Sequence, residues 1–349
     1  MTDAAAAHAA VDPVAALRRI AFLLERSLEP SFKVRAFRRA AAAIERLDPD
    51  ELRALAAGPG LRALPGIGEA TERVIREALA GETPVYLRRL EAIEAGPVAE
   101  GAASLRAALR GDCHTHSTWS DGGSDIREMA LTARDLGHAY IALTDHSPRL
   151  QVARGLSPER LRAQLDEVAA LNEELAPFRI LTGIEVDINE DGSLDQEEEL
   201  LARLDLVVAS VHSKLRMDAA EMTRRMVRAV VNPHTDILGH PTGRLLGGGR
   251  GRRPESSFDA AVVFAACARS GTAVEVNSRP ERQDPPKRLL RLAMEAGCRF
   301  AIDTDAHAPG QLDWQLGGCE RAFACGITPD LVVNTVPAED LLAWATARA

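Results

Sequence analysis

The sequence predicts two structural classes in one chain: an all-helical N-terminal part and, after residue 111, an α/β part built as a closed barrel of strands and helices. Up to residue 95, apolar residues recur three and four positions apart, as on amphipathic helices. The stretch 96–110 is rich in Gly, Pro and Ala and has little pattern, as at a domain junction. After residue 111, short β-branched runs alternate with helical stretches, which is typical of parallel strands joined by helices.

The N-terminal part is predicted to contain five helices and no strand. Asp12, Asp48 and Thr83 each precede a proline and are expected to cap a helix start. The expected helices cover residues 13–29, 32–47, 50–57, 68–79 and 84–93. We therefore expect a helical domain over 1–95, a linker over 96–110 and a second domain over 111–349.

The second domain is predicted to contain seven strands. They are expected near residues 112–117, 140–144, 179–188, 206–211, 237–240, 273–277 and 300–304. Helices are expected between them, near 124–136, 158–175, 196–202, 219–231, 258–270 and 286–296. Seven βα repeats suit a closed barrel better than an open doubly wound sheet, which remains the alternative because periodicity does not show closure.

The composition limits the classes of function. The chain has 42 basic and 51 acidic side chains, and the first 95 residues hold 14 of each, so the whole net charge of −9 falls after them. This balance argues against holding nucleic acid by bulk charge alone. The apolar runs are short for a membrane span and no signal pattern is present, so we expect a cytoplasmic protein without a membrane partner. Five cysteines without a CxxC pair indicate neither a disulfide framework nor a thiolate zinc site.

Histidine and carboxylate side chains recur where the predicted strands end. In a barrel of parallel strands these ends meet at one mouth, so the side chains should converge. Imidazole and carboxylate ligands without thiolate suit Zn, Mn or Fe in a hydrolytic site. The sequence therefore predicts a multinuclear metal centre. Its candidate ligands are His114, His116, Asp121, His146, Glu185, His212, His240, Asp305 and His307.

Other polar residues near these strand ends have candidate roles in binding. Asp112 and Asp303 are candidates for carboxylates that orient ligating imidazoles. Cations that follow the ligand segments are candidates for gripping a substrate phosphate. They are Arg149, Arg154, Lys214 and Arg244. The glycine-rich stretch 247–254 carries Arg250, Arg252 and Arg253 and is a candidate lid or phosphate clamp, or else a surface loop without function.

The segments that carry these ligands resemble the ordered motifs of the PHP (polymerase and histidinol phosphatase) family, in the version found at the C-terminus of bacterial family X DNA polymerases. They are Gly111-Asp-Cys-His-Thr-His-Ser-Thr-Trp-Ser-Asp-Gly-Gly, Ala142-Leu-Thr-Asp-His, Gly183-Ile-Glu-Val-Asp, Ser210-Val-His-Ser, Leu238-Gly-His-Pro and Ile302-Asp-Thr-Asp-Ala-His. The resemblance implies a distorted (β/α)7 barrel that holds three divalent ions, of Mn, Zn or Fe.

The resemblance also implies how the ligands divide. The first ion would lie on His114, His116, Glu185 and Asp305; Glu185 would bridge to a second ion on His212 and His240; Asp121, His146 and His307 would hold the third. A metal-activated hydroxide held by Glu185, His212 and His240 would then attack phosphorus without a side-chain nucleophile. Asp121 stands where many family members have histidine, which favours manganese at the third position because carboxylate is the harder ligand.

The N-terminal segments Pro30-Ser-Phe-Lys-Val-Arg-Ala-Phe-Arg-Arg-Ala-Ala and Leu64-Pro-Gly-Ile-Gly-Glu-Ala resemble the helix-hairpin-helix domain of family X polymerases. The hairpin residues and nearby arginines are expected to contact DNA phosphates without sequence readout. They are Gly66, Ile67, Gly68, Arg35, Arg38 and Arg39. Two departures matter. Ala70 and Val74 stand where lyase-active relatives have lysines, and no polymerase palm lies between the two domains, so we expect neither lyase nor polymerase activity.

The sequence thus predicts a metal-dependent phosphoesterase that processes DNA 3′ ends, or acts as a 3′-5′ exonuclease, in DNA repair. The principal alternative is a small-molecule phosphomonoesterase of the histidinol phosphatase type. An amidohydrolase-type deaminase or lactonase also begins with an HxH strand, but Glu185 and the Asp305/His307 pair fit it poorly. A non-catalytic DNA-binding module is disfavoured by the presence of all nine ligand-type residues.

Overall fold

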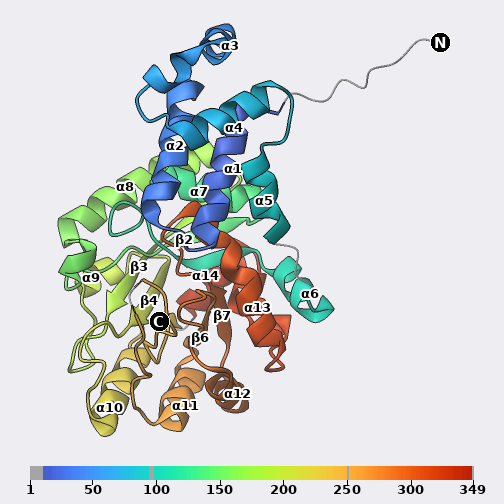
Figure 1. The fold of residues 1–349 in the computed structure, drawn as a ribbon. Helices are drawn as coiled ribbons and strands as arrows, with labels where there is room; N and C mark the ends of the chain where they lie inside the picture. Colours follow the sequence, from blue (N-terminus) through green and yellow to red (C-terminus); the bar gives the residue numbers. More distant parts are fainter. Residues whose placement is uncertain (1–10, 94–97, 250, 348–349) are drawn as a thin grey trace. The chain divides into compact units, whose positions relative to one another are not determined.

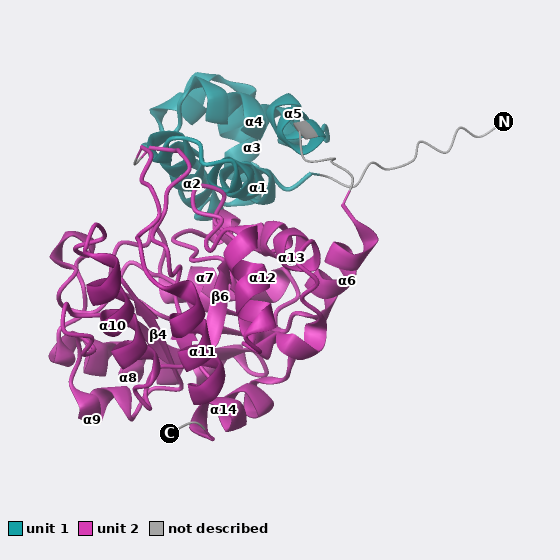
Figure 2. Cartoon of the chain, turned by 90° about the horizontal axis from the view of Figure 1, so that it is seen from below, with its two compact units in different colours: residues 1–97 teal, residues 98–349 magenta. Residues whose placement is uncertain are grey.

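The computed structural model describes residues 11–93, 98–249 and 251–347 (Figure 1). The chain divides into two units, Met1–Pro97 and Val98–Ala349, coloured separately in Figure 2. Each is described on its own below. Within the described ranges, no helix combines the length and the apolar character needed to cross a bilayer.

The first unit is helical, as predicted. Its helices are α1 (Pro13–Arg26), α2 (Ser31–Glu45), α3 (Pro49–Ala57), α4 (Glu69–Leu79) and α5 (Val85–Ile93), with a 3-10 turn η1 (Pro59–Ala63) after α3. Asp12 accepts from the Val14 and Ala15 N–H groups and Asp48 from that of Asp50, so both cap their helices. The cap predicted at Thr83 is wrong: α5 begins only at Val85, whose N–H donates to Glu77 Oε2.

The second unit contains seven parallel strands whose spatial order follows the sequence. They are β1 (Gly111–Thr115), β2 (Tyr140–Leu143), β3 (Arg179–Asp187), β4 (Leu206–Ser210), β5 (Ile237–Leu238), β6 (Ala273–Asn277) and β7 (Phe300–Asp303). The sheet curls until β1 approaches β7, where Thr115 pairs with Ala306. The predicted barrel is confirmed, and it is nearly closed.

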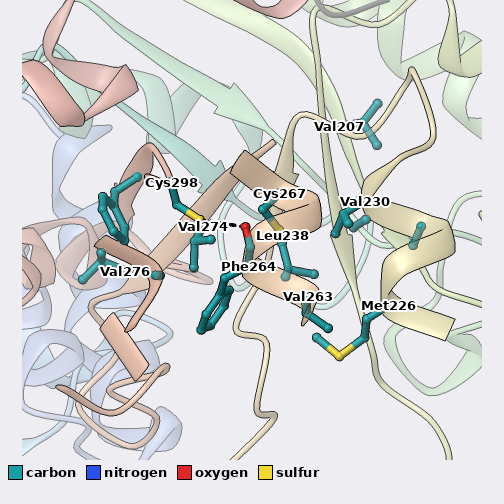
Figure 3. Packing of buried hydrophobic residues seen from close by; sticks show 14 of the residues in the cluster. Val207, Met226, Val230, Leu238, Val263, Phe264, Cys267, Val274, Val276 and Cys298 are labelled. Atoms are coloured by element: carbon teal, nitrogen blue, oxygen red, sulfur yellow. Dashed lines mark hydrogen bonds between the residues drawn. The ribbon is translucent and has the colours of Figure 1, made fainter. Parts of the chain in front are cut away.

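Helices surround the strands (Figure 1). They are α6 (Glu100–Ala108), α7 (Ile126–Asp135), α8 (Pro158–Leu175), α9 (Glu198–Leu201), α10 (Ala219–Val230), α11 (Ala260–Ser270), α12 (Lys287–Glu295), α13 (Gln315–Phe323) and α14 (Ala338–Thr346). Figure 3 shows the apolar layer between α11 and the barrel, where Phe264 and Cys267 lie near Leu238 and Val274. The Cys298 thiol donates to the Phe264 carbonyl in the same layer. This layer fixes the strands that carry the site.

Three helices depart from the sequence-based expectation. The predicted linker over 96–110 contains α6, whose Ala102 and Leu105 are buried, and α6 packs against α13. Helices α13 and α14 were not predicted. These helices are nine residues each, and α6 is stabilised by a partner about two hundred residues away, a contact that local periodicity does not report.

Side-chain amides join β1 and β7 below their single backbone bridge. Asn334 Nδ2 donates to the carbonyls of Gly111 and Ile302 at 3.0 and 2.9 Å, and Gln315 Nε2 donates to the same two carbonyls at 3.0 Å each. Asn334 Oδ1 accepts from the Ile302 N–H. We call Asn334 and Gln315 with these strand carbonyls the β1/β7 seam. It supplies the hydrogen bonds that a continuous backbone ladder would otherwise provide.

Candidate metal centre

The nine predicted ligand side chains lie together at the carboxyl ends of the strands. Glu185 of β3 is at their centre. Its carboxylate oxygens lie 2.9 Å from His146 Nδ1, 3.2 Å from His212 Nε2 and 2.8 Å from His240 Nε2. The same carboxylate lies 3.3 Å from His114 Nε2. Side chains from β1 to β5, distant in sequence, therefore meet around one buried carboxylate.

The remaining candidates complete the group. His116, two residues after His114, lies with its ring centroid 5.1 Å from that of His114, as expected for neighbours on one strand face. Asp305 Oδ1 lies 3.3 Å from His116 Nε2. Asp121 Oδ1 lies 3.4 Å from His146 Nε2 and 3.3 Å from His307 Nε2. Asp305 has a φ of 55°, in the left-handed region that aspartate tolerates better than most residues.

The unpaired buried atoms of this group indicate that it is suited to bind metal ions. Several buried nitrogen and oxygen atoms have no partner of hydrogen-bond geometry, although carboxylates lie close. They are His114 Nε2, both ring nitrogens of His116 and of His212, His146 Nδ1, His240 Nδ1 and Glu185 Oε2. Leaving so many buried polar atoms unpaired costs free energy unless a ligand satisfies them. Converging imidazole and carboxylate groups fit divalent ions of the Zn, Mn or Fe type.

Three sets of ligand atoms lie within 4.8 Å of one another: His116/Asp121/His146/His307, His114/His116/Asp305 and His146/Glu185/His212. These sets overlap, because His116 and His146 each belong to two of them. They differ in this respect from the division expected from the resemblance, in which each imidazole holds one ion. His240 lies outside the three sets and reaches the group through Glu185.

Burial and neighbouring charge shift the pKa values of this group in different directions. Burial, with the neighbouring His307 and His146 rings, lowers the pKa of His116 to about 3, so its imidazole is neutral. Burial alone would raise the pKa of Glu185, but the His212 and His114 rings outweigh it and hold that pKa well below its usual range. At His212 burial disfavours the charged form, but Glu185 and Asp187 together raise its pKa to about 9.

Two carboxylates that the sequence analysis missed orient this group. Glu275 of β6 lies with Oε1 2.6 Å from His114 Nδ1, and its Oε2 accepts from the backbone N–H of His240. Asp187 Oδ1 accepts from the His212 N–H and lies 3.5 Å from His212 Nδ1. Both carboxylates stand inside buried β-branched strand segments, where an acid is uncommon, and this feature of the sequence would have identified them.

The role predicted for Asp112 and Asp303 is wrong. Asp112 accepts from the N–H groups of His114 and Thr304, and Asp303 from that of Cys113. Among the described contacts neither carboxylate bonds an imidazole. Both hold the backbones of β1 and β7 together, deeper in the barrel than the ligand group.

A cavity of about 330 Å³ opens onto the ligand group. Its walls are Asp121, His146, Leu150, Val152, Ala153, His212, Arg253, Arg282, Asp305 and His307. None of the four cations predicted to bind substrate belongs to this lining. Arg149 donates to Asn189 and Arg244 donates to the Arg282 and Gln283 carbonyls. Arg154 and Lys214 are exposed, since proximity in sequence does not determine which way a loop side chain turns.

The cations that do line the cavity are Arg253 and Arg282. Arg253 belongs to the predicted basic loop, where its backbone pairs with that of Leu245. Arg282 follows β6, is 6% exposed, and lies with Nε 3.1 Å from Asp305 Oδ2. It was missed by the sequence analysis. Of the other loop arginines, Arg252 is exposed and Arg250 lies outside the described residues.

In the first unit the predicted hairpin joins η1 to α4. Gly66 has a φ of 91°, and a Cβ there would lie 3.3 Å from Arg39 Cβ, so the turn needs glycine and lies against α2. Gly68 is extended and stands at the N-cap of α4. Ile67 is buried, so its side chain belongs to the core.

The three predicted DNA-contacting arginines of α2 differ. Arg35 and Arg39 are exposed, whereas Arg38 binds the buried Glu25 carboxylate through two bonds of 2.8 and 2.9 Å. Arg38 is therefore a structural cation of the unit. Val74 of α4 is 1% exposed and lies in the core.

Comparison with known proteins agrees with this geometry. Residues 9–84 match the helix-hairpin-helix domain family and residues 112–279 match the PHP domain family. The chain is 41% identical over 270 residues to the DNA polymerase/3′-5′ exonuclease PolX of Bacillus subtilis (strain 168), covering 77% of this chain and 45% of that relative. The chain thus spans less than half the length of this relative.

A second relative is covered almost completely. A probable phosphatase of Thermoanaerobacter sp. (strain X514) is 31% identical over 239 residues, which cover 64% of this chain and 89% of the phosphatase. Histidinol phosphate phosphatase from Lactococcus lactis is a distant structural neighbour, with 18% identity and a TM-score of 0.43 over 62% of this chain and 92% of that one. The domain matches and the full-length relative agree with the converging imidazoles and carboxylates, and the chain belongs to the PHP family of metal-dependent phosphoesterases, with a helix-hairpin-helix domain ahead of its PHP domain.

Proposed function

We propose that this chain hydrolyses phosphodiester bonds at DNA 3′ ends, acting as a 3′-5′ exonuclease or end-trimming enzyme in DNA repair. The observation that carries the proposal is the set of unpaired imidazole nitrogens around Glu185, which lie beside a cavity that also contains Arg282. The relative from Bacillus subtilis bears an exonuclease name and is 41% identical to this chain over 270 residues. With DNA as its substrate, the protein would act in the cytoplasm.

The nine candidate ligands would hold three divalent ions, of manganese, zinc or iron, and His116 and His146 are placed to be shared between neighbouring positions. Divalent ions so held would activate water near neutral pH and would neutralise the charge of a phosphoester during in-line attack on phosphorus. Glu185 stays ionised and the His116 imidazole stays neutral, which are the forms that bind metal. Glu275 fixes the His114 ring by its Nδ1, which directs Nε2 toward Glu185.

Arg282 is the cation best placed to hold the substrate phosphate. Its side chain lines the cavity, is nearly buried and lies beside Asp305, so its charge acts where solvent screening is weak. A guanidinium offers several N–H donors in one plane, which suits the non-bridging oxygens of a phosphate. Arg253 is the second cation of the cavity lining.

The helix-hairpin-helix domain would supply the grip on duplex DNA. The Gly66 turn leads into the N-terminus of α4, and Arg39 lies directly under that turn. Backbone N–H groups at a helix start bind phosphate without reading sequence. Glu69 and Glu72 in the first turn of α4 weaken that site, which is consistent with a modest, salt-sensitive affinity. Among the residues that the structure describes between the two matched domains, only α5 and α6 are formed, so polymerase activity is not part of the proposal.

The proposal is tested with the full chain loaded with manganese and a duplex carrying a recessed 3′ end and a 5′ label. Denaturing gels should show the labelled strand shortened from its 3′ end in single-nucleotide steps, and a chelator should abolish the shortening. Glu185→Gln should be inactive, whereas Glu199→Gln, which changes an exposed carboxylate of α9, should behave as the wild type. Intact DNA under conditions where a phosphomonoester is hydrolysed would refute nuclease action.

The second candidate function is hydrolysis of a small phosphomonoester. It is favoured by the probable phosphatase of Thermoanaerobacter, which this chain covers over 89% of its length. Turnover of small phosphomonoesters by the same metal-loaded protein, with DNA left intact at every metal and salt concentration, would establish this candidate in place of the first.

A further inference from the structure

One wall of the cavity differs chemically from the others. Leu150, Val152 and Ala153 form an apolar wall, whereas the remaining lining residues are imidazoles, carboxylates and arginines. We call the three residues the apolar wall. Val152 is 91% exposed although it lines a cavity that reaches the ligand group. A single exposed valine needs no explanation, but three apolar neighbours facing a polar catalytic group across one cavity do.

The loop that carries this wall is held in place on both sides. Asp195 Oδ2 accepts from Ser147 Oγ at 2.9 Å and from the Arg149 N–H at 2.6 Å. The Leu156 N–H donates to the His146 carbonyl at 2.7 Å. The exposed valine therefore stands on a braced loop that is tied to His146, in the segment after β2, and to Asp195.

A glycine makes the tight path of this loop feasible. A Cβ at Gly155 would lie 1.8 Å from the Ser147 carbonyl oxygen, so no larger residue fits where the loop returns. Arg160 of α8 then donates to the carbonyls of Arg154 and Gly155. The apolar wall is thus built to a fixed position, which is what binding a rigid group requires and what a loose surface loop does not provide.

The size of the cavity points to an occupant beyond the phosphate. A volume of about 330 Å³ lies in the range of sites that take organic ligands. The phosphate has its own partners at Arg282 and the ligand group, on the polar side. The organic group esterified to that phosphate is then left facing Leu150, Val152 and Ala153.

We propose that the apolar wall is the subsite for the nucleoside of the 3′-terminal nucleotide, with Val152 packed against its sugar or base. This proposal rests on the proposed function, from which the nucleoside follows as the organic group. Contact with an apolar side chain accepts any of the four bases, because it reads no hydrogen-bond pattern. Val152 therefore determines preference for a nucleoside over a smaller ester group, and leaves the chemistry at phosphorus unchanged.

The test compares two diesters that share a leaving group: thymidine 5′-(4-nitrophenyl phosphate) and methyl 4-nitrophenyl phosphate. The metal-loaded wild type should prefer the thymidine ester in kcat/KM. Val152→Asp should raise KM for the thymidine ester at least fivefold, about the effect of losing one valine contact, and leave the methyl ester within twofold. The control is Val262→Asp, at a half-exposed valine of α11 that does not line the cavity.

Three outcomes distinguish failure of the nucleoside subsite from failure of the proposed function. A thymidine-to-methyl ratio unchanged by Val152→Asp overturns the subsite while diester hydrolysis stands. Equal losses on both esters also overturn it, since the loop would then act only by supporting His146. If the wild type cleaves neither diester but does cleave monoesters, the DNA proposal fails. The wild type and Val152→Asp are then compared on thymidine 5′-phosphate and methyl phosphate, and the ratio of the two kcat/KM values decides the subsite.

Discussion

Two buried polar regions of the same barrel contrast sharply. At the β1/β7 seam, the Asn334 amide both accepts from and donates to strand backbone groups. At the mouth, both ring nitrogens of His116 and of His212 are buried without a hydrogen bond. The seam binds Gly111 of β1 and Ile302 of β7, whereas the mouth lies at the carboxyl ends of these and the other strands. The polar groups of the seam bond to one another and stabilise the fold, whereas those of the mouth are left for a ligand. The apolar layers outside the barrel hold the strands and offset the free-energy cost of these unpaired groups.

The largest effect should follow a change at the centre of the mouth. Glu185→Gln removes the negative charge shared by the surrounding imidazoles and should lower kcat/KM about a thousandfold, since the ions contribute several kcal/mol to the transition state. Circular dichroism should remain native. Elemental analysis should show fewer bound ions than in the Glu199→Gln control. Activity within tenfold of the wild type would mean that Glu185 is not central.

The seam should respond in the opposite way. Asn334→Ala leaves the Ile302 N–H without its acceptor and removes two donors, so the free energy of unfolding should fall by about 3 kcal/mol. Urea unfolding of the metal-free protein measures this loss. At a temperature where the variant is folded, its metal content and its kcat/KM should match those of the wild type. A loss of metal without a loss of stability would remove the distinction between the two regions.

Glu275 shares a feature with each region, because its carboxylate is hydrogen-bonded, as in the seam, but its partners are ligand residues of the mouth. Glu275→Gln cannot accept from both His114 Nδ1 and the His240 N–H with the same strength, and metal affinity should fall 10- to 100-fold, roughly what removal of such an orienting carboxylate costs. Competition with a fluorescent chelator gives the affinity. Unaltered affinity, with a lower unfolding free energy, would instead place Glu275 with the seam.

The smallest effect concerns a buried histidine outside both regions. Burial, with Arg106 nearby, lowers the pKa of His138 to about 3, so the unfolded chain binds a proton that the folded chain does not between pH 6.5 and 3. This part of the stability is present above pH 6.5 and is lost as the pH falls. His138→Gln should reduce the loss between pH 7 and 5 by about 2 kcal/mol.

Denaturant unfolding of both proteins at the two pH values measures this difference. Equal pH dependence would show that His138 is not held neutral by burial.

The sequence predicted the barrel and the converging residues because both depend on strand order: His114, Glu185 and Asp305 stand at strand ends whatever the loops do. It did not predict α6, whose partner α13 is remote, nor Arg282, one of the two arginines that line the cavity. Arg149 follows the ligand segment after β2 and Arg282 follows β6, yet Arg149 turns to Asn189 while Arg282 lines the cavity. The direction of each of these side chains depends on loop geometry, which a local sequence pattern does not predict.

The role of Asn334 could not be predicted from the sequence either. Its partners Gly111 and Ile302 lie in the first and last strands, and they meet only when the barrel closes. A buried amide that serves backbone groups leaves no periodic pattern in the sequence. Glu275, by contrast, was accessible, because a carboxylate inside a buried strand is unusual enough to indicate a partner.

The central claim is that the nine side chains at the mouth form one metal centre. Anomalous diffraction from crystals of the manganese-loaded protein tests it directly. The account predicts three peaks bounded by His114, Glu185, His240, Asp121 and His307, with Arg282 facing them across the cavity. A map without a peak among these residues, from crystals of protein that is active with manganese, would contradict it.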